Sequence, residues 1–152
     1  MAYLTPKTDW TITISGGNYV GDFLNASDYT RICDNITYLA LLINTQYGTS
    51  ITLDPMASMT VNSIPYATDF NAIESNIQKL CSALVTPASW TGQKTWYANK
   101  PTPTVNDWNR WEATILGIKQ RVDYDANWVG FITSDNEPFT DVVGNYFKVL
   151  GA

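Results

Sequence analysis

The sequence predicts an α+β fold that is mainly α: a three-helix bundle of three tandem helix repeats, with short β-hairpins and extended segments between and after them. Two observations predict it. Three stretches carry apolar residues in alternating steps of three and four, which mark one narrow apolar stripe on a helix. Each stretch opens on an Asp followed by an aromatic residue, at Asp28, Asp69 and Asp107, so the stretches form an internal repeat.

The three stripes define the expected core of the bundle. Helices with narrow apolar stripes pack stripe against stripe, so these side chains should be buried together and should support both folding and assembly. The predicted core residues are Tyr29, Ile32, Ile36 and Leu39 in the first copy, Phe70, Ile73, Ile77 and Leu80 in the second, and Trp108, Trp111, Ile115 and Ile118 in the third.

Capping residues place the helices at about residues 25–44, 66–85 and 104–122. A carboxylate in the first turn of a helix faces unpaired N–H groups and the positive end of the helix dipole. Asn and Thr are good N-caps, so the first and third copies resemble capping boxes with Asp in place of Glu. The predicted N-terminal caps are Asn25, Asp28, Asp69, Thr104 and Asp107. The second copy has no capping side chain at residue 66, but Pro65 just before it is compatible with a helix start.

The segments outside the helices are predicted to be extended. Residues 11–15 alternate as a strand does, Gly16-Gly17 supplies a two-residue turn, and residues 18–20 return as a second strand. Residues 50–53 are predicted as a short strand and residues 90–103 as an extended, turn-rich stretch. Residues 128–132 and 146–150 are predicted as a terminal strand pair.

The chain fits one domain of 152 residues. The repeat units cover about residues 8–48, 49–86 and 87–123, and a C-terminal β or extended segment covers residues 124–152. No apolar run approaches the ~20 residues that a membrane-spanning helix needs, and the N-terminus is unlike a signal peptide. We therefore expect the chain to be made and folded in a cytoplasm.

The composition favours a surface that a partner covers. Charged residues make up 15% of the chain, below the usual ~25%, while six Trp and nine Tyr are present. The aromatic residues predicted to lie at an interface are Trp90, Trp96, Tyr97 and Trp128. A net charge of −5, with only nine Lys and Arg, is unlike proteins that bind nucleic acid or anionic membranes.

Residues that commonly act in catalysis or bind metal ions are scarce, so we predict that the chain is not an enzyme and binds no cofactor or metal. The chain has no His, which removes the commonest general base and metal ligand. Cys33 and Cys81 form a disulfide only if their helices place the Cα atoms close together; otherwise both are buried free thiols. Two acidic pairs fall in predicted loops, where they are either solvated turn residues or a pair flanking a glycosidic bond. These pairs are Asp123 with Asp125 and Asp135 with Glu137.

The repeated motif carries a family resemblance. Residues 24–36 read Leu-Asn-Ala-Ser-Asp-Tyr-Thr-Arg-Ile-Cys-Asp-Asn-Ile, and they resemble a segment common in tail-fibre and baseplate proteins of bacteriophages, most of all those infecting Gram-positive hosts. That family's pattern is roughly Leu/Phe-Asn-Ala-x-Asp/Asn-aromatic/Leu-Asn-Arg/Lys-Ile-Glu-x-Asn/Gly-Ile. Residues 69–77 and 106–115 carry the second and third copies. The chain departs from the pattern at Thr30 for Asn, Cys33 for Glu, Ala72 for the basic residue and Trp111 for Ile.

The resemblance implies a non-enzymatic structural protein of a phage virion. Such a protein would be a tail, baseplate or fibre-attachment component, assembled in the host cytoplasm with other virion proteins and present as a homo-oligomer or in several copies. The alternatives are a module that binds host cell-surface glycans and a hydrolase acting on the cell envelope. In fibres of this kind three subunits often contribute one helix each to a bundle. Here the three copies either surround a pseudo-threefold axis or form an ordinary three-helix domain.

Overall fold

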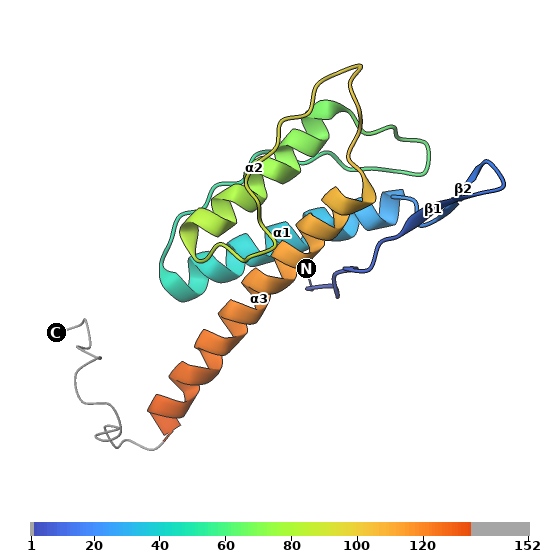
Figure 1. The fold of residues 1–152 in the computed structure, drawn as a ribbon. Coiled ribbons are helices and arrows are strands. Elements are labelled where there is room, and N and C mark those ends of the chain that lie inside the picture. Colours follow the sequence, from blue (N-terminus) through green and yellow to red (C-terminus); the bar gives the residue numbers. More distant parts are fainter. Residues whose placement is uncertain (1, 135–152) are drawn as a thin grey trace. The chain divides into compact units, whose positions relative to one another are not determined.

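The computed structural model describes residues 2–134, and the side chains of residues 2–127. In chain order its elements are β1 (Ile12–Ser15), β2 (Asn18–Gly21), α1 (Ala26–Tyr47), α2 (Ala67–Ala83) and α3 (Val105–Ser134). The fold is α+β and mainly α, as predicted, with three packed helices and one two-stranded antiparallel sheet (Figure 1). The chain divides into two compact units, Met1–Val122 and Asp123–Ala152.

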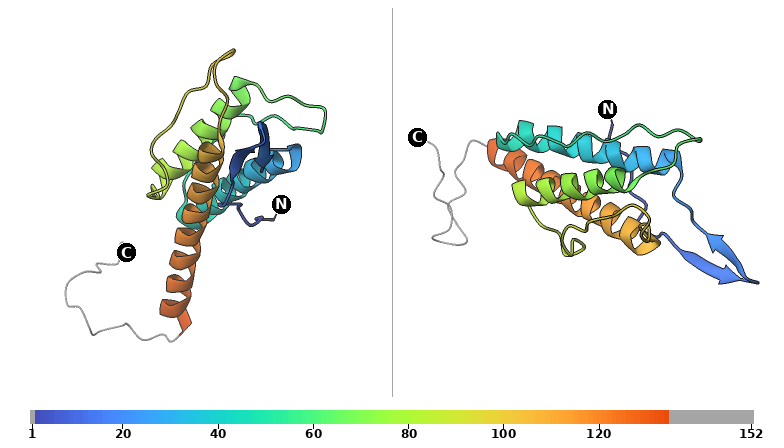
Figure 2. Two further views of the ribbon diagram at one scale, coloured as in Figure 1. Left: turned by 45° about the vertical axis from the view of Figure 1, so that its right-hand side comes forward. Right: turned by 90° about the horizontal axis from the view of Figure 1, so that it is seen from above.

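Within the first unit the helices are parallel. α1, α2 and residues 105–122 of α3 start at the same end, beside the β-hairpin, and extended chain returns along the bundle between one helix and the next (Figure 2). A parallel bundle in a single chain needs such returns, because each helix ends far from where the next begins. The segments between helices are therefore part of the architecture and line the helices along their length.

The apolar stripes meet in one core. Eleven of the twelve predicted core residues are buried, and Trp108 is partly buried against the same cluster. The apolar steps continue to Ile43, Leu84 and Val122; Ile43 and Val122 are also buried, and Leu84 is partly buried against the cluster. From the extended segments, Trp90, with 6% of its surface exposed, joins this cluster, and Trp10, with 3% exposed, is buried beside Trp108, their ring centres 5.1 Å apart. The narrow stripes are thus supplemented by aromatic residues from outside the helices.

The β-hairpin has the predicted two-residue turn. Ser15 pairs with Asn18, and the intervening Gly16 and Gly17 have φ angles of 59° and 80°. Two consecutive positive φ angles match a type I′ turn, which suits the twist of the flanking strands and which Gly adopts without strain. Ile12 and Ile14 lie on one face with Tyr19, so the hairpin is amphipathic.

Each helix start has its Asp in a capping contact. The Asn25 side chain accepts from the backbone N–H groups of Ser27 and Asp28, at 2.9 and 3.0 Å. The Asp69 carboxylate accepts the Tyr66 backbone N–H at 2.7 Å, and the Asp107 carboxylate accepts the Thr104 backbone N–H at 2.9 Å. The three helices therefore start in the same way, although the residue before the first turn differs.

Two of the predicted strands are wrong. Residues 50–53 are extended but pair with no strand, because Ile51 instead exchanges backbone hydrogen bonds with the side chain of Asn44, at 2.7 and 3.1 Å. Residues 128–132 belong to α3, which continues to Ser134, so the predicted extended segment is helical over residues 124–134. No Gly or Pro follows Val122 until Gly130, and a short apolar run does not by itself distinguish strand from helix. Residues 146–150 lie outside the described residues.

Candidate functional site

Polar residues at repeated positions connect the three helices near their starts. Counting from the Asp of each copy, an Arg stands three residues later in the first and third copies, at Arg31 and Arg110. A Glu stands five residues later in the second and third copies, at Glu74 and Glu112. Because the helices are parallel, these positions lie at the same level of the bundle, where side chains from neighbouring helices meet.

Two buried ion pairs link neighbouring helices in one rotational sense. Arg31 of α1 donates to the Glu112 carboxylate of α3, at 3.1 Å from Nε and 2.5 Å from an Nη atom. Arg110 of α3 donates from an Nη atom to the Glu74 carboxylate of α2. Both carboxylates have 0% of their surface exposed. A third ion pair in this rotational sense would run from α2 to α1. The position equivalent to the Arg is Ala72 in α2 and the position equivalent to the Glu is Cys33 in α1, so neither charge of this pair is present.

Asn side chains bind the extended segments to the helices. The amide of Asn35 accepts the Leu4 N–H and donates to its carbonyl, both at 2.8 Å. The equivalent Asn76 holds Asp54 in the same two-bond arrangement, at 2.7 and 3.0 Å. Thr114 occupies this position in α3, and its hydroxyl lies 3.0 Å from the Ser89 hydroxyl. Each helix thus holds the extended segment that precedes it.

A second set of Asn side chains binds two of the extended segments to a neighbouring helix. Asn71 of α2 exchanges two hydrogen bonds with the Trp96 backbone, at 2.7 and 2.9 Å. Asn109 of α3 does the same with Trp10, at 2.9 Å for both bonds. These Asn residues stand two positions after the Asp, where the first copy has Thr30. Two of the three extended segments are therefore held between two helices, and their contacts repeat around the bundle.

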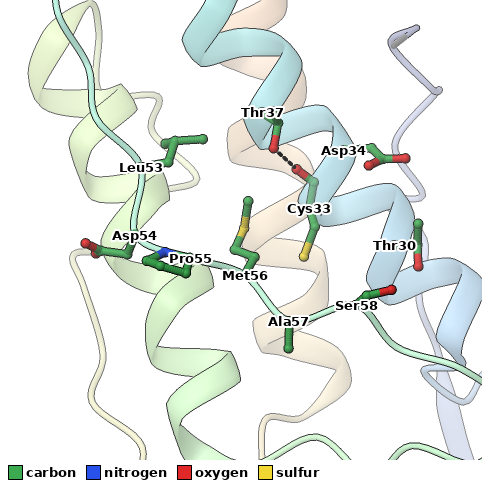
Figure 3. A pocket seen from close by; sticks show the side chains of 10 residues that line it. All are labelled: Thr30, Cys33, Asp34, Thr37, Leu53, Asp54, Pro55, Met56, Ala57 and Ser58. Atoms are coloured by element: carbon green, nitrogen blue, oxygen red, sulfur yellow. Dashed lines mark hydrogen bonds between the residues drawn. The ribbon is translucent and has the colours of Figure 1, made fainter.

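The ion pairs and the second set of Asn contacts form a ring around the bundle that lacks its third member, between α2 and α1. We call it the open seam: Thr30 and Cys33 of α1, Ala72 of α2, and the facing segment 53–58. A pocket of about 410 Å³ lies there, between α1 and that segment (Figure 3). Its position follows from the sequence, because it lies where the Asn and Glu of the other copies are replaced by the shorter Thr30 and Cys33. The contacts between α1 and α3 and between α3 and α2 thus follow one repeating pattern, and the open seam between α2 and α1 lacks them.

Burial governs the ionisation of groups in this region. Desolvation raises the pKa of Glu112, and the Arg31 hydrogen bond and charge offset part of that effect. For Asp107, desolvation is outweighed by hydrogen bonds from Lys94 and Thr104, so the pKa of this carboxyl is lowered. Burial also raises the pKa of the Cys33 thiol to about 12 and that of Cys81 to about 11. Both cysteines are free and buried, so both are protonated and unreactive at neutral pH.

The predicted interface aromatics are separated by the fold. Trp90 is buried, with its indole N–H donated to Gln78 at 2.8 Å and the Arg110 guanidinium 4.6 Å from its ring centre. Trp96 is partly buried against the core, whereas Tyr97 is 65% exposed. The side chain of Trp128 lies outside the described residues. Only Tyr97 of this set is therefore shown on the surface, and Trp90 was wrongly predicted at an interface.

The acidic pairs do not form a site in the described part of the chain. Asp123 and Asp125 lie in α3 and not in a loop, and side chains two residues apart on a helix point in different directions. Asp135 and Glu137 lie outside the described residues. Among residues 2–134 no group of three His, Cys, Asp or Glu side chains is placed to hold a metal ion. No helix in this range has the length and apolarity needed to span a membrane.

Exposed apolar side chains gather just before the helices. We define three arms, residues 12–21, 57–66 and 95–104, each of which precedes one helix at the common end of the bundle (Figure 1). Of the twelve large apolar side chains exposed in the described part, seven lie in these arms: Ile14, Tyr19, Val20, Val61, Ile64, Tyr66 and Tyr97. The arms contain a single charged residue, Lys100. Of these seven residues only Tyr97 was predicted at an interface, because apolar residues in loops show no periodicity.

Comparisons with models of protein families, with curated proteins and with solved structures find no match to this chain.

Proposed function

We propose that the chain is a non-enzymatic structural protein of a bacteriophage virion, a component of the tail, baseplate or fibre-attachment region that acts by protein–protein assembly. One observation carries the assembly role: the arms expose uncharged apolar side chains at one end of a rigidly connected bundle. Interfaces are depleted of charge at their centre, as these arms are. The placement in a virion is supported by the resemblance of the repeated motif to phage tail-fibre and baseplate proteins.

The polar groups of the bundle support the same proposal. The buried Arg, Glu and Asn side chains described above have their partners inside the bundle, where they connect helices to one another and to the extended segments. These side chains hold the backbone of Trp96 inside the third arm and the backbones of Trp10 and Asp54 just before the other two, and such anchors preorganise a surface. A scaffold that positions apolar loops is suited to binding a protein partner.

The test is the location of the chain in purified particles of the virus that encodes it. We expect tryptic peptides of the chain in particles purified through a density gradient, at a constant ratio to the other tail proteins. Particles treated with high salt should retain it, because apolar contacts are not screened by ions. A chain that is abundant in infected cells but absent from particles would show the proposal to be wrong.

A further inference from the structure

We propose that residues 55–65, in the extended chain before α2, form a strap that opens away from α1 while the rest of the bundle stays folded. The fixed ends of this strap are Asp54 and Tyr66. The inference goes beyond the proposed function, because the opening is a property of the isolated chain. It follows from how the strap is held, from how little of it is buried and from the pocket beside it.

The strap is fixed at its two ends and is not hydrogen-bonded to α1 between them. The Asn76 side chain exchanges two hydrogen bonds with the Asp54 backbone, and the Tyr66 N–H donates to the Asp69 carboxylate at 2.7 Å. Between these points the only hydrogen bonds within the described part of the chain close the strap's own turn, at residues 60–63. The strap can therefore leave α1 without breaking a hydrogen bond to it.

The other two extended segments are held to a neighbouring helix as well. Asn71 and Asn109 make that contact, and both side chains are partly buried. The equivalent residue of α1 is Thr30, which is exposed and donates its hydroxyl to the Ala26 carbonyl of its own helix at 2.8 Å. The strap thus lacks the contact that fixes the other two segments to a second helix.

Few side chains of the strap are buried. Only Met56, Met59 and Pro65 are even partly buried, and the two methionines pack against the core cluster. The other two segments contribute the buried indoles of Trp10 and Trp90. A segment with few buried apolar contacts opens locally at a low free energy, and Met side chains adapt to altered packing.

The pocket of the open seam lies between the strap and α1 (Figure 3). Residues 55–58 of the strap line one side, and Cys33 of α1 lines the other, with its sulfur directed toward the strap. The strap therefore spans a cavity here and not a packed contact. Cys33 is 9% exposed, and burial raises the pKa of its thiol to about 12, so this thiol is unreactive until the strap opens.

Opening of the strap moves part of the exposed apolar surface. Val61 and Ile64 lie on the strap and, at 92% and 77%, are the most exposed large apolar residues in the described part of the chain. They can change position relative to the bundle, whereas the segments that Asn71 and Asn109 hold cannot do so without breaking hydrogen bonds. The second arm is therefore the adjustable one.

The test is labelling of the two free cysteines in the purified full chain with a small thiol reagent, in the absence of denaturant. Mass spectrometry of the peptides gives separate rates for Cys33 and for Cys81, which is 4% exposed and does not line the pocket. We expect Cys33 to be modified at least about tenfold faster, because local opening costs less free energy than global unfolding. Equal rates would overturn the inference, since both thiols would then be reached by unfolding of the whole bundle.

Three variants separate opening of the strap from other routes to Cys33. Met59→Ala removes a strap contact and should raise the Cys33 rate roughly 5–30-fold, whereas Val61→Ala, at an exposed position of the strap, should leave it unchanged. Ile118→Val weakens the core in α3, so it should raise the unfolded fraction measured by chemical denaturation roughly 2–10-fold and leave the Cys33 rate unchanged.

Two results of these variants would overturn the inference. A Cys33 rate that Met59→Ala leaves unchanged would mean that the reagent enters the pocket without any opening. A Cys33 rate that Ile118→Val raises in proportion to the unfolded fraction would mean that the thiol is reached by global unfolding.

Discussion

At the scale of single residues, buried charges hold the helices in register. Glu74 accepts hydrogen bonds from Arg110 and from the Trp111 indole, the latter at 2.9 Å, and from the Lys94 backbone at 3.0 Å. A carboxylate with no exposed surface is tolerated because several donors surround it. Removing its charge leaves the buried Arg110 guanidinium with the Asp107 carboxylate, 3.8 Å away, in place of a hydrogen-bonded counter-ion.

We therefore expect Glu74→Gln to lower the free energy of unfolding by about 3–5 kcal/mol, the usual cost of breaking a buried ion pair from one side. Chemical denaturation followed by Trp fluorescence measures it. The matched control is Lys79→Met, which breaks an exposed pair with Asp54 and should cost no more than about 1 kcal/mol. Equal effects of the two substitutions would contradict the role given to Glu74.

Glu112 predicts a pH dependence of stability. Because its pKa in the folded chain is raised above the ordinary value of 4.5, the folded chain binds a proton more readily than the unfolded chain. The stability contributed by that proton is fully present below pH 4.5 and is lost as the pH rises through the folded pKa. Glu112→Gln should remove this component.

The measurement is the free energy of unfolding of both proteins between pH 4 and 8. The advantage of the wild type over the Gln variant should be larger at the acidic end of this range. All other carboxyl groups are common to the two proteins, so the difference isolates Glu112. A difference that is constant with pH would show that the raised pKa has no bearing on stability.

At the scale of elements, the open seam is where the repeat has lost a contact. Ala72 and Cys33 occupy the positions at which the other seams carry Arg and Glu, so the missing ion pair should be restorable. Cys33→Glu alone places an unpaired carboxylate at a buried position, and Ala72→Arg alone adds an unpaired guanidinium. Together they should pair across α1 and α2, as Arg31 pairs with Glu112.

A double-mutant cycle tests this expectation. We expect the free energy of unfolding of the double variant to be higher than the sum of the two single changes predicts, with a coupling energy of about 1–3 kcal/mol. Strictly additive effects would mean that the third seam does not have the geometry of the other two. The control is the same cycle with Ala113→Arg in place of Ala72→Arg. Because Ala113 lies on α3 and not at the open seam, we expect no coupling with Cys33→Glu.

Much of the element order could be predicted from periodicity. The stripes placed α1 and α2 within three residues of their observed bounds, and Gly16-Gly17 placed the hairpin turn. The end of α3 was missed because aromatic and β-branched residues after Val122 are compatible with either state. The ring of contacts was not predicted either. Asn35 repeats as Asn76, and Asn71 repeats as Asn109, but their partners are backbone groups, which leave no pattern in the side chains.

At the scale of the whole first unit, one core serves all three repeats. Ile77 has no exposed surface and lies mid-stripe in α2, where it belongs to the same cluster as Ile36 and Ile115. Because the cluster is continuous, damage at one stripe should affect all helices. The repeats are therefore expected to unfold together and not one by one.

Ile77→Asp should abolish folding of the unit, since it buries an unpaired charge in the centre of the core. Circular dichroism should show loss of helix together with loss of the near-ultraviolet Trp signal. The control Thr68→Asp changes an exposed residue in the first turn of the same helix and should leave the fold intact. A folded Ile77→Asp protein would show that the stripe is not the common core.

The contact between Trp10 and Asn109 joins positions 99 residues apart, so the beginning of the chain is fixed by its third helix. During synthesis the opening segment must therefore wait until residue 109 has left the ribosome before it gains that anchor. Contacts between such distant positions slow folding, because the intervening chain must first be ordered. The opening segment of the nascent polypeptide consequently stays without this anchor until α3 has emerged and packed.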